Sequence, residues 1–478
     1  MIKHIQAGQE SLILGAVEAG EKISEGSISA SEYVEQLLKR ADAMGHLNAF
    51  TFLNREALLQ DTKKLDQNCR KSLSMPLLGV PIGIKSNIDV AGMPTNAGTA
   101  ALKNHIPDRT APAVTALTTA GALVAGKLNM HELAFGVTSN NGVFGEVRNP
   151  YNVKHVAGGS SGGNAAAIAA GIIPAALGTD TGGSTRGPAA LCGIVGMRPT
   201  IWRYPQAGVV PISHTRDTIG PMARNVKDVV CLDGLITGEP LHIEPANLGN
   251  LRLGMPDTFY DNLHPDIERK MEQVLDMLRQ LGTTIVKIDV SDMTSLASEV
   301  SMPICFYEVL RDIPRYLSKT NASTTLEDIV AQIGSPDVRG IFDILMNEDR
   351  VGERDYYDVM AIKRPALRAA CRHHFKEHKL DAFVFPTTRL PAPLIEDHIE
   401  TVHNGQTIST FQALILNTDY AGSADMPGVT IPIGLTQDGL PIGIEFDGLP
   451  GTDRKLLSIV TALEAQLPPM PLPDFLSF

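Results

Sequence analysis

Residues 158–187 read GGSSGGNAAAIAAGIIPAALGTDTGGSTRG and carry the strongest signal in this chain. Two glycine-rich loops, 158–163 and 179–186, each contain serine. Between them, the almost uncharged stretch 164–174 predicts a buried helix, and 175–178 predicts a short buried strand. The two loops are therefore expected to flank a central element of the fold.

The sequence around these loops alternates short apolar runs with glycine turns. Strands are predicted at 78–84, 122–125, 380–385, 429–434 and 441–446, and helices at 111–120 and 453–467. A β-α-β unit is predicted from strands 251–254 and 284–290 around an amphipathic helix, 265–281, that stops at Gly282. This alternation indicates an α/β core.

The N-terminal part of the chain, through about residue 64, has the periodicity of amphipathic helices. In the segment 29–43, apolar side chains recur at helical spacing, and either Ser29 or Ser31 could cap the helix. This region is expected to be scaffold.

Length and composition indicate a globular, enzyme-sized protein. The chain has 478 residues, of which 43% are hydrophobic and 20% charged, so a large core can form. We find no low-complexity linker or internal repeat, which favours one large domain.

Charge and cysteine content restrict the partners and the compartment. A net charge of −12 without clusters of Lys and Arg argues against nucleic acid. The apolar run 12–17 is soon broken by Glu18 and Glu21, so neither a signal peptide nor a membrane span is expected. Five widely spaced cysteines suit free thiols in a reducing compartment, so we expect a cytoplasmic protein: Cys69, Cys192, Cys231, Cys305 and Cys371.

The residues themselves suggest a serine hydrolase that works without histidine. The loops offer serines for attack and proton relay, and Lys85, in GVPIGIKSN (79–87), offers an amine that could accept a proton. The GxSxG string at 158–162 is weak evidence alone, because the preceding 149–155 is turn-rich and not a buried strand. A glycine turn that binds a phosphate therefore remains open.

The run 158–200, together with 79–98, closely resembles the amidase signature family, and a looser resemblance extends over 37–467. The resemblance implies an α/β fold with a central twisted mixed sheet covered by helices on both faces. It also implies a single domain, 1–478, built from a helical region 1–65, a signature core 66–230, a variable pocket region 231–420 and closing elements 421–478.

Carried over by position, the family's roles fall on particular residues. The nucleophile falls on Ser184, the bridging serine with a cis peptide bond on Ser160, and the base on Lys85. The backbone donors to the oxyanion fall on Thr181, Gly182 and Gly183, with Ser184 as a further candidate.

A lysine can act as a base at neutral pH only if its pKa is lowered from about 10.4, which burial would do. The apolar neighbours Ile82, Ile84 and Ile88 support burial. Ser86 stands where the family usually has aspartate, which removes a carboxylate that would favour the ammonium form. Gly187 stands where the family has a larger apolar residue, so it could either loosen packing or enlarge a pocket.

Other polar residues near the loops are expected to have structural roles. Asp180 and Arg186 should fix the nucleophile loop by hydrogen bonds and charge pairing. His131–Glu132 begins like a zinc-binding helix but lacks the second histidine, and His374 and His378 are expected on a solvated helix face. We predict no metal and no cofactor.

The resemblance implies an amidase that cleaves a small primary amide to carboxylate and ammonia through an acyl-enzyme on Ser184. Segments 129–142 and 208–218 look like the indole-acetamide and mandelamide hydrolase branch, which points to arylacetamides. Phe135, Phe144 and Tyr307 are the expected pocket walls. The partner is a small-molecule amide, and the resemblance is compatible with a homodimer.

Two other functions remain open. One is the glutaminase-type subunit of a tRNA-dependent amidotransferase. The other is a non-enzymatic phosphate-binding module, which ranks last because no lysine directly follows Gly163.

Overall fold

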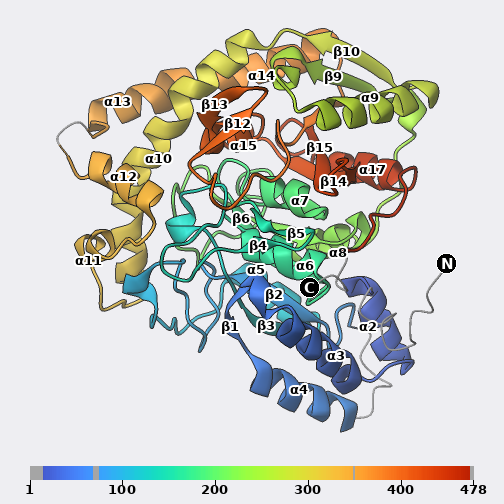
Figure 1. Cartoon of the computed structure of the whole chain (residues 1–478), viewed down its shortest axis with the longest axis vertical. Coiled ribbons are helices and arrows are strands. Elements are labelled where there is room, and N and C mark those ends of the chain that lie inside the picture. The colour runs from blue at the N-terminus through green and yellow to red at the C-terminus, as the bar shows by residue number, and fades with distance from the viewer. Residues whose placement is uncertain (1–13, 68–74, 348–349, 474–478) are drawn as a thin grey trace.

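The computed structural model describes residues 14–67, 75–347 and 350–473. An eleven-stranded sheet runs through the molecule, from β10 near the top of Figure 1 to β1 near the bottom. In spatial order its strands are β1 Phe50–Leu53, β3 Leu123–Leu128, β2 Pro81–Lys85, β6 Ala175–Asp180, β8 Thr218–Ala223, β7 Val195–Arg198, β14 Gly428–Leu435, β15 Pro441–Asp447, β11 Ala382–Pro386, β9 Arg252–Pro256 and β10 Thr284–Ile288.

The sheet is mixed, as expected. β2 is parallel to β3 and β6, and β9 is parallel to β10 and β11. The other neighbouring pairs are antiparallel. This one sheet combines strands from the predicted regions 66–230, 231–420 and 421–478. The strands β14 and β15, from the last region, lie between β7 of the first and β11 of the second.

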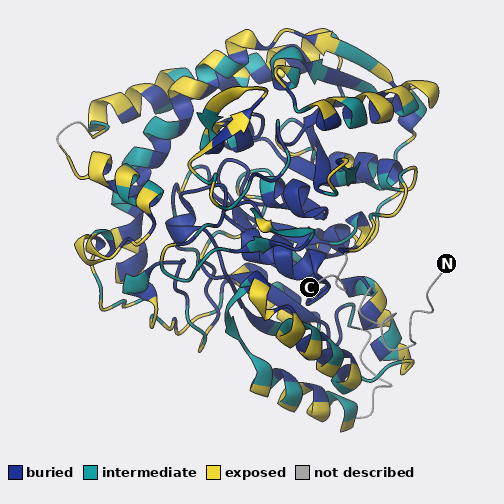
Figure 2. Cartoon of the chain, viewed as in Figure 1, coloured by how far each residue is buried: buried dark blue, intermediate teal, exposed yellow. Residues whose placement is uncertain are grey.

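Both faces of the sheet are covered by helices, because side chains along a strand alternate between the faces and the central strands are apolar on both. In β6, Ala175 and Leu177 belong to one core, and Ala176 belongs to another. The first core is formed with α2 Ala16–Glu25, α5 Pro112–Thr119, α8 Val226–Thr237, α9 Pro265–Gln280 and α17 Asp453–Glu464. On the other face lie α6 Gly162–Ala169 and α7 Arg186–Cys192. Figure 2 shows the sheet and these inner helices as the most deeply buried part of the chain.

The N-terminal region contains the predicted helices and also one strand, β1, that was not predicted. Ser29 is the cap of α3 Ala30–Ala43: its hydroxyl accepts the Glu32 N–H at 3.0 Å within a capping box. A further helix, α4 Arg55–Gln67, follows. Between the two lies β1, which pairs antiparallel with β3 and which the helical interpretation of 1–65 did not include.

The predicted β-α-β unit is confirmed, since β9, α9 and β10 follow in order and the strands are parallel. The central helix is shorter than predicted: α6 ends at Ala169, and Gly171 adopts a left-handed φ of 67° just after it. β6 continues past the expected end at Gly178 to Asp180.

A helical arm that periodicity did not reveal packs beside the sheet. It contains α10 Ser291–Lys319, α11 Leu326–Ala331, α12 Pro336–Leu345, α13 Glu353–Asp358, a π-helical turn Val359–Lys363 and α14 Arg364–His378. Smaller elements complete the fold: the strand pairs β4 Arg148–Asn149 with β5 Asn152–Val156 and β12 Glu400–His403 with β13 Gln406–Ser409, and the helices α15 Thr410–Ile415 and α16 Asp419–Ser423.

Within the described ranges, no helix is both long and apolar enough to cross a membrane. Cys192, Cys231, Cys305 and Cys371 are buried free thiols, and Cys69 lies outside the described residues. The first two residues of the apolar run 12–17 also lie outside them.

Candidate active site

Lys85 lies at the carboxyl end of β2, beside the carboxyl end of its parallel neighbour β6. Parallel strands present these ends at the same edge of a sheet. The Lys85 side chain is fully buried, and its Nζ lies 2.8 Å from Ser160 Oγ, 2.8 Å from Thr179 Oγ1 and 3.3 Å from the Thr179 carbonyl oxygen. The topology therefore joins the lysine segment to both glycine loops.

Burial lowers the pKa of the Lys85 amine to about 7. The carboxylates of Asp180 and Asp217 act in the opposite direction, but they offset only part of the desolvation. An amine with this pKa is substantially uncharged at neutral pH, which is the state a base requires.

The contacts of Lys85 suit an uncharged amine, which has two N–H groups and one lone pair. The Thr179 carbonyl oxygen can only accept, and Thr179 Oγ1 already accepts a hydrogen bond from Asn87 Nδ2 at 3.1 Å. If both N–H groups are donated to Thr179, the lone pair of Lys85 is free to accept the hydroxyl proton of Ser160. The geometry thus permits proton transfer from serine to lysine.

The loops that carry Ser160 and Ser184 lie side by side. The peptide bond between Gly159 and Ser160 is cis. The backbone N–H of Ser161 donates to the Ser184 carbonyl at 3.2 Å, which ties the two loops side by side. The Ser184 hydroxyl makes no hydrogen bond within the described part of the chain, so it is available to a ligand.

The loop 181–184 turns several N–H groups away from protein acceptors. In the described ranges, the N–H groups of Thr181, Gly182 and Ser184 have no acceptor. The N–H of Gly183, in contrast, donates to Asp180 Oδ1 at 2.9 Å. Gly183 is therefore the one expected oxyanion donor whose N–H is already engaged, and Ser184 offers an N–H in its place.

Asp180 holds the loop 181–186 in place through hydrogen bonds and ion pairs. Its carboxylate accepts the N–H of Gly183 and of Thr185, the latter at 3.0 Å. It also pairs with Arg186 at 3.0 Å and with Arg198 at 3.2 Å, and these three charged side chains are fully buried. Burial alone would raise the pKa of Asp180, but the two guanidinium groups outweigh it and hold the pKa below its ordinary value.

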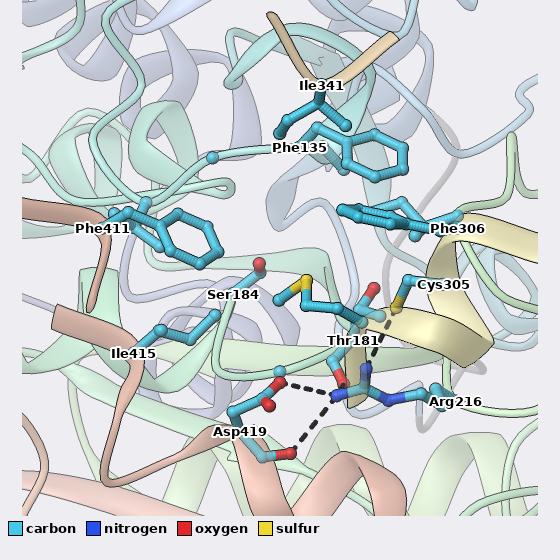
Figure 3. Close-up of a pocket in the computed structure, with 16 residues that line it drawn as sticks. Phe135, Thr181, Ser184, Arg216, Cys305, Phe306, Ile341, Phe411, Ile415 and Asp419 are labelled. Atoms are coloured by element: carbon cyan, nitrogen blue, oxygen red, sulfur yellow. Dashed lines mark hydrogen bonds and ion pairs between the residues drawn. The ribbon is translucent and has the colours of Figure 1, made fainter. Parts of the chain in front are cut away.

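A cavity of about 60 Å³ opens beside Ser184, and we call it the large cavity because it is the larger of the two hollows that Ser184 lines. Phe135 lines it, as predicted from the sequence, and Figure 3 shows Phe135, Phe306 and Phe411 around the space above Ser184. Its other lining residues are Ala134, Gly136, Val137, Thr181, Gly182, Ile212, Arg216, Met302, Cys305, Ile341, Ile415 and Asp419. The walls are thus mainly apolar and aromatic.

The other two expected wall residues lie elsewhere. Tyr307 stacks on Tyr356 with ring centroids 4.1 Å apart and does not line the large cavity. Phe144 is also absent from the lining, and its carbonyl accepts a hydrogen bond from Asn48 at 2.8 Å. Phe306, the neighbour of Tyr307 on α10, takes the wall position.

A second hollow, the small compartment, is also lined by Ser184. It is lined by Val137, Gly159, Gly183, Ser184, Gly187, Leu191, Leu414, Ile415 and Thr418 and has a volume of about 10 Å³. A Cβ built on Gly187 would meet no atom within 4 Å. The glycine at 187 therefore widens this compartment and does not relieve a close contact.

The histidines considered for a metal have protein partners. Nε2 of His131 lies 2.9 Å from Asp337 Oδ2, and the Glu132 carboxylate accepts the N–H of Ser335 at 2.8 Å. These contacts fix the start of α12 against the loop that carries Phe135. His374, which was expected on a solvated helix face, is buried on α14, and its Nε2 lies 2.8 Å from Asp292 Oδ1.

The chain is similar to proteins of one family. The family described as Amidase matches residues 32–457. The chain is 40% identical to an indoleacetamide hydrolase of Agrobacterium vitis, over 96% of this chain and 98% of that protein. It is also 40% identical to the mandelamide hydrolase of Pseudomonas putida, over 96% of this chain and 92% of that protein.

Solved structures agree with this likeness. A crystal structure of an amidase shares 32% identity with a TM-score of 0.84 and covers 95% of this chain and 100% of its own. The native peptide amidase of Stenotrophomonas maltophilia shares 27% identity with a TM-score of 0.76, over 96% of this chain and 98% of its own.

Replacement of Asp180 should destabilise the protein strongly. We expect Asp180→Asn to lower the free energy of unfolding by about 3–5 kcal/mol, because it leaves two buried guanidinium groups short of a countercharge. Urea denaturation of the purified variant measures this loss. Asp42→Asn is the control, since Asp42 pairs with Arg55 at the surface, and it should cost less than about 1 kcal/mol. Equal losses for the two variants would contradict the assigned role of Asp180.

Proposed function

The chain belongs to the amidase family and is an amide hydrolase, and we propose that it cleaves a primary arylacetamide to carboxylate and ammonia through an acyl-enzyme on Ser184. The observation that carries this proposal is the buried Lys85 amine, 2.8 Å from the Ser160 hydroxyl, with a pKa lowered to about 7. A base of this kind can drive a serine nucleophile at neutral pH without histidine.

In the proposed first step, Ser184 Oγ attacks the amide carbonyl carbon. Its proton passes to Ser160 Oγ, and the Ser160 proton passes to Lys85 Nζ. The negative charge that forms on the carbonyl oxygen is stabilised by N–H groups of the loop 181–184 that have no protein acceptor.

The intermediate then collapses. The proton returns from Lys85 through Ser160 to the amide nitrogen, the C–N bond breaks, and ammonia leaves. Water then attacks the ester on Ser184 by the same relay and releases the carboxylate. No cofactor enters this scheme.

The two hollows around Ser184 support the proposed substrate class. The large cavity offers aromatic walls to an acyl group, for which an aryl ring is the best match. The small compartment suits a small leaving group such as ammonia. Two relatives at 40% identity are named for the hydrolysis of indoleacetamide and mandelamide, which both join an aromatic ring to an acetamide unit.

Glutamine is a poorer match for the large cavity. Its α-carboxylate and α-ammonium groups would need spare countercharges. The charged lining residues Arg216 and Asp419 are already paired with each other at 2.6 Å. The glutaminase alternative is therefore less well supported.

Loss of the nucleophile should abolish turnover. We expect Ser184→Ala to lower kcat by at least about 10⁴-fold. Ser160→Ala and Lys85→Ala should each lose about 10²–10⁴-fold, the usual contribution of proton transfer. Mass spectrometry of the wild type after treatment with a fluorophosphonate should find the label on Ser184.

The matched control is Ser86→Ala. Ser86 follows Lys85 directly, and its hydroxyl lies 2.7 Å from that of Thr51. Activity within about tenfold of wild type is expected, because this hydroxyl takes no part in the relay. A Ser184→Ala enzyme with near-normal kcat would refute the proposed nucleophile.

The rate should depend on pH through Lys85. Because burial lowers its pKa to about 7, the amine is protonated and inactive below that pH and free above it. We expect kcat/KM to rise with pH, with a midpoint near 7, and to level off on the alkaline side. Asp217 raises the pKa of Lys85, so Asp217→Asn should move the midpoint to lower pH. A flat profile between pH 6 and 9 would argue against Lys85 as the base.

Aromatic amides should be the better substrates. We expect kcat/KM for phenylacetamide and indole-3-acetamide to exceed that for acetamide and propionamide by about 100-fold or more, since a buried aryl ring adds a few kcal/mol of apolar contact. Ammonia release measures all four substrates. The opposite ranking would remove the proposed substrate class while leaving the amidase chemistry in place.

A further inference from the structure

The large cavity contains a pair of charges that the proposed chemistry does not use. Of its sixteen lining residues, Arg216 and Asp419 are the charged ones. Figure 3 shows the pair at one end of the cavity and Phe135 and Ile341 at the other, with Ser184 between them. An ion pair in an otherwise apolar wall calls for an explanation.

The guanidinium group of Arg216 is already occupied by the protein. Its Nη1 lies 2.8 Å from Ser301 Oγ and 3.0 Å from Cys305 Sγ. Its Nη2 donates to Asp419 Oδ1 at 2.6 Å and to the Thr181 carbonyl at 3.3 Å. The side chain is fully buried, so Arg216 holds the wall together and offers its terminal nitrogens to no ligand.

Asp419, in contrast, is only half engaged. Its Oδ1 accepts from Arg216, while Oδ2 accepts no hydrogen bond from any residue within 14–67, 75–347 or 350–473. The side chain keeps 18% of its surface exposed. A carboxylate oxygen accepts up to two hydrogen bonds, so Asp419 leaves an acceptor at the cavity wall.

The position of Asp419 indicates which part of a substrate could donate a hydrogen bond to its carboxylate. The Asp419 carboxylate lies beside the loop 181–184: a Cβ built on Gly182 would be 2.3 Å from Oδ1, the oxygen that accepts from Arg216, and Oδ2 is the second oxygen of the same group. It lines the large cavity and does not line the small compartment. A matching donor therefore belongs to the acyl group, next to the amide carbonyl, and not to the leaving amine.

The net charge of the cavity wall indicates whether a charged or a neutral hydrogen-bond donor would bind to Asp419. Arg216 and Asp419 cancel each other, so the cavity wall carries no net charge that would favour an ammonium group or a carboxylate. We propose that Asp419 selects substrates whose acyl group carries a neutral hydrogen-bond donor, a hydroxyl or a ring N–H, close to the amide carbonyl. This inference rests on the proposed function and specifies its substrate class further.

The test compares mandelamide with phenylacetamide, which differ by one α-hydroxyl group. The wild type should prefer one enantiomer of mandelamide over phenylacetamide by about tenfold or more in kcat/KM, as a hydrogen bond to a charged acceptor allows. In Asp419→Asn, the amide oxygen pairs with Arg216 and a donor faces the cavity. Both the preference and the discrimination between enantiomers should then fall to about twofold or less.

A second variant covers the case in which Asp419→Asn does not fold. Arg216→Met combined with Asp419→Leu replaces the pair by apolar side chains of similar size and leaves no unpaired guanidinium. The same loss of preference is expected. Asp425→Asn is the matched control: Asp425 pairs with Arg364 at 2.9 Å, does not line the cavity, and should leave the preference unchanged.

The outcomes separate the two proposals. If the wild type hydrolyses both amides but shows no preference for mandelamide, or if the folded variants keep that preference, the inference about Asp419 is wrong and the proposed function stands. If the wild type hydrolyses neither amide, the proposed arylacetamide substrate falls, and the selection by Asp419 falls with it.

Discussion

The site depends on keeping one amine out of water. Lys85 ends a buried strand, and its Nζ is surrounded by Thr179 and Ser160 within hydrogen-bond distance. An ammonium group in such a place lacks hydration, so the uncharged form is favoured and a lone pair becomes available. The parallel pairing of β2 and β6 sets the amine at this depth, because it brings the two strand ends to one edge of the sheet.

The same edge has to hold a charged carboxylate close to that amine. Asp180 stays ionised because Arg186 and Arg198 surround it, and its oxygens fix the N–H groups of the nucleophile loop. Without these two guanidinium groups, the charge of Asp180 would raise the pKa of Lys85 further and favour its ammonium form. Arg186 also pairs with Glu445 on β15, so the loop is anchored to a strand far along the chain.

The sequence was most informative about segments whose key residues lie close together along the chain. The glycine loops and the lysine segment are contiguous motifs, so the family resemblance could predict the mixed sheet correctly, while the roles that it implies for Lys85, Ser160 and Ser184 stay predictions. The hydrogen bond from the Gly183 N–H to Asp180 could not be predicted from the motif, because it depends on the orientation of one aspartate side chain.

The pocket walls could not be found in the same way. Side chains one residue apart on a helix point about 100° apart, so the choice between Phe306 and Tyr307 depends on the phase of α10, which contains two prolines. The partner of Arg216 lies 203 residues further along the chain, on a short helix with no motif. β1 was missed because four half-buried residues between helices give too short a pattern.

Part of the cavity wall comes from later regions of the chain than the candidate catalytic residues. Lys85, Ser160 and Ser184 belong to the signature core, while Met302, Ile341 and Phe411 are among the walls supplied by later helices and loops. Substitutions in those later elements would change the shape of the cavity while leaving the strand ends that hold Lys85 in place. The chain thus separates the residues that could tune its selectivity from those that set the depth of the amine.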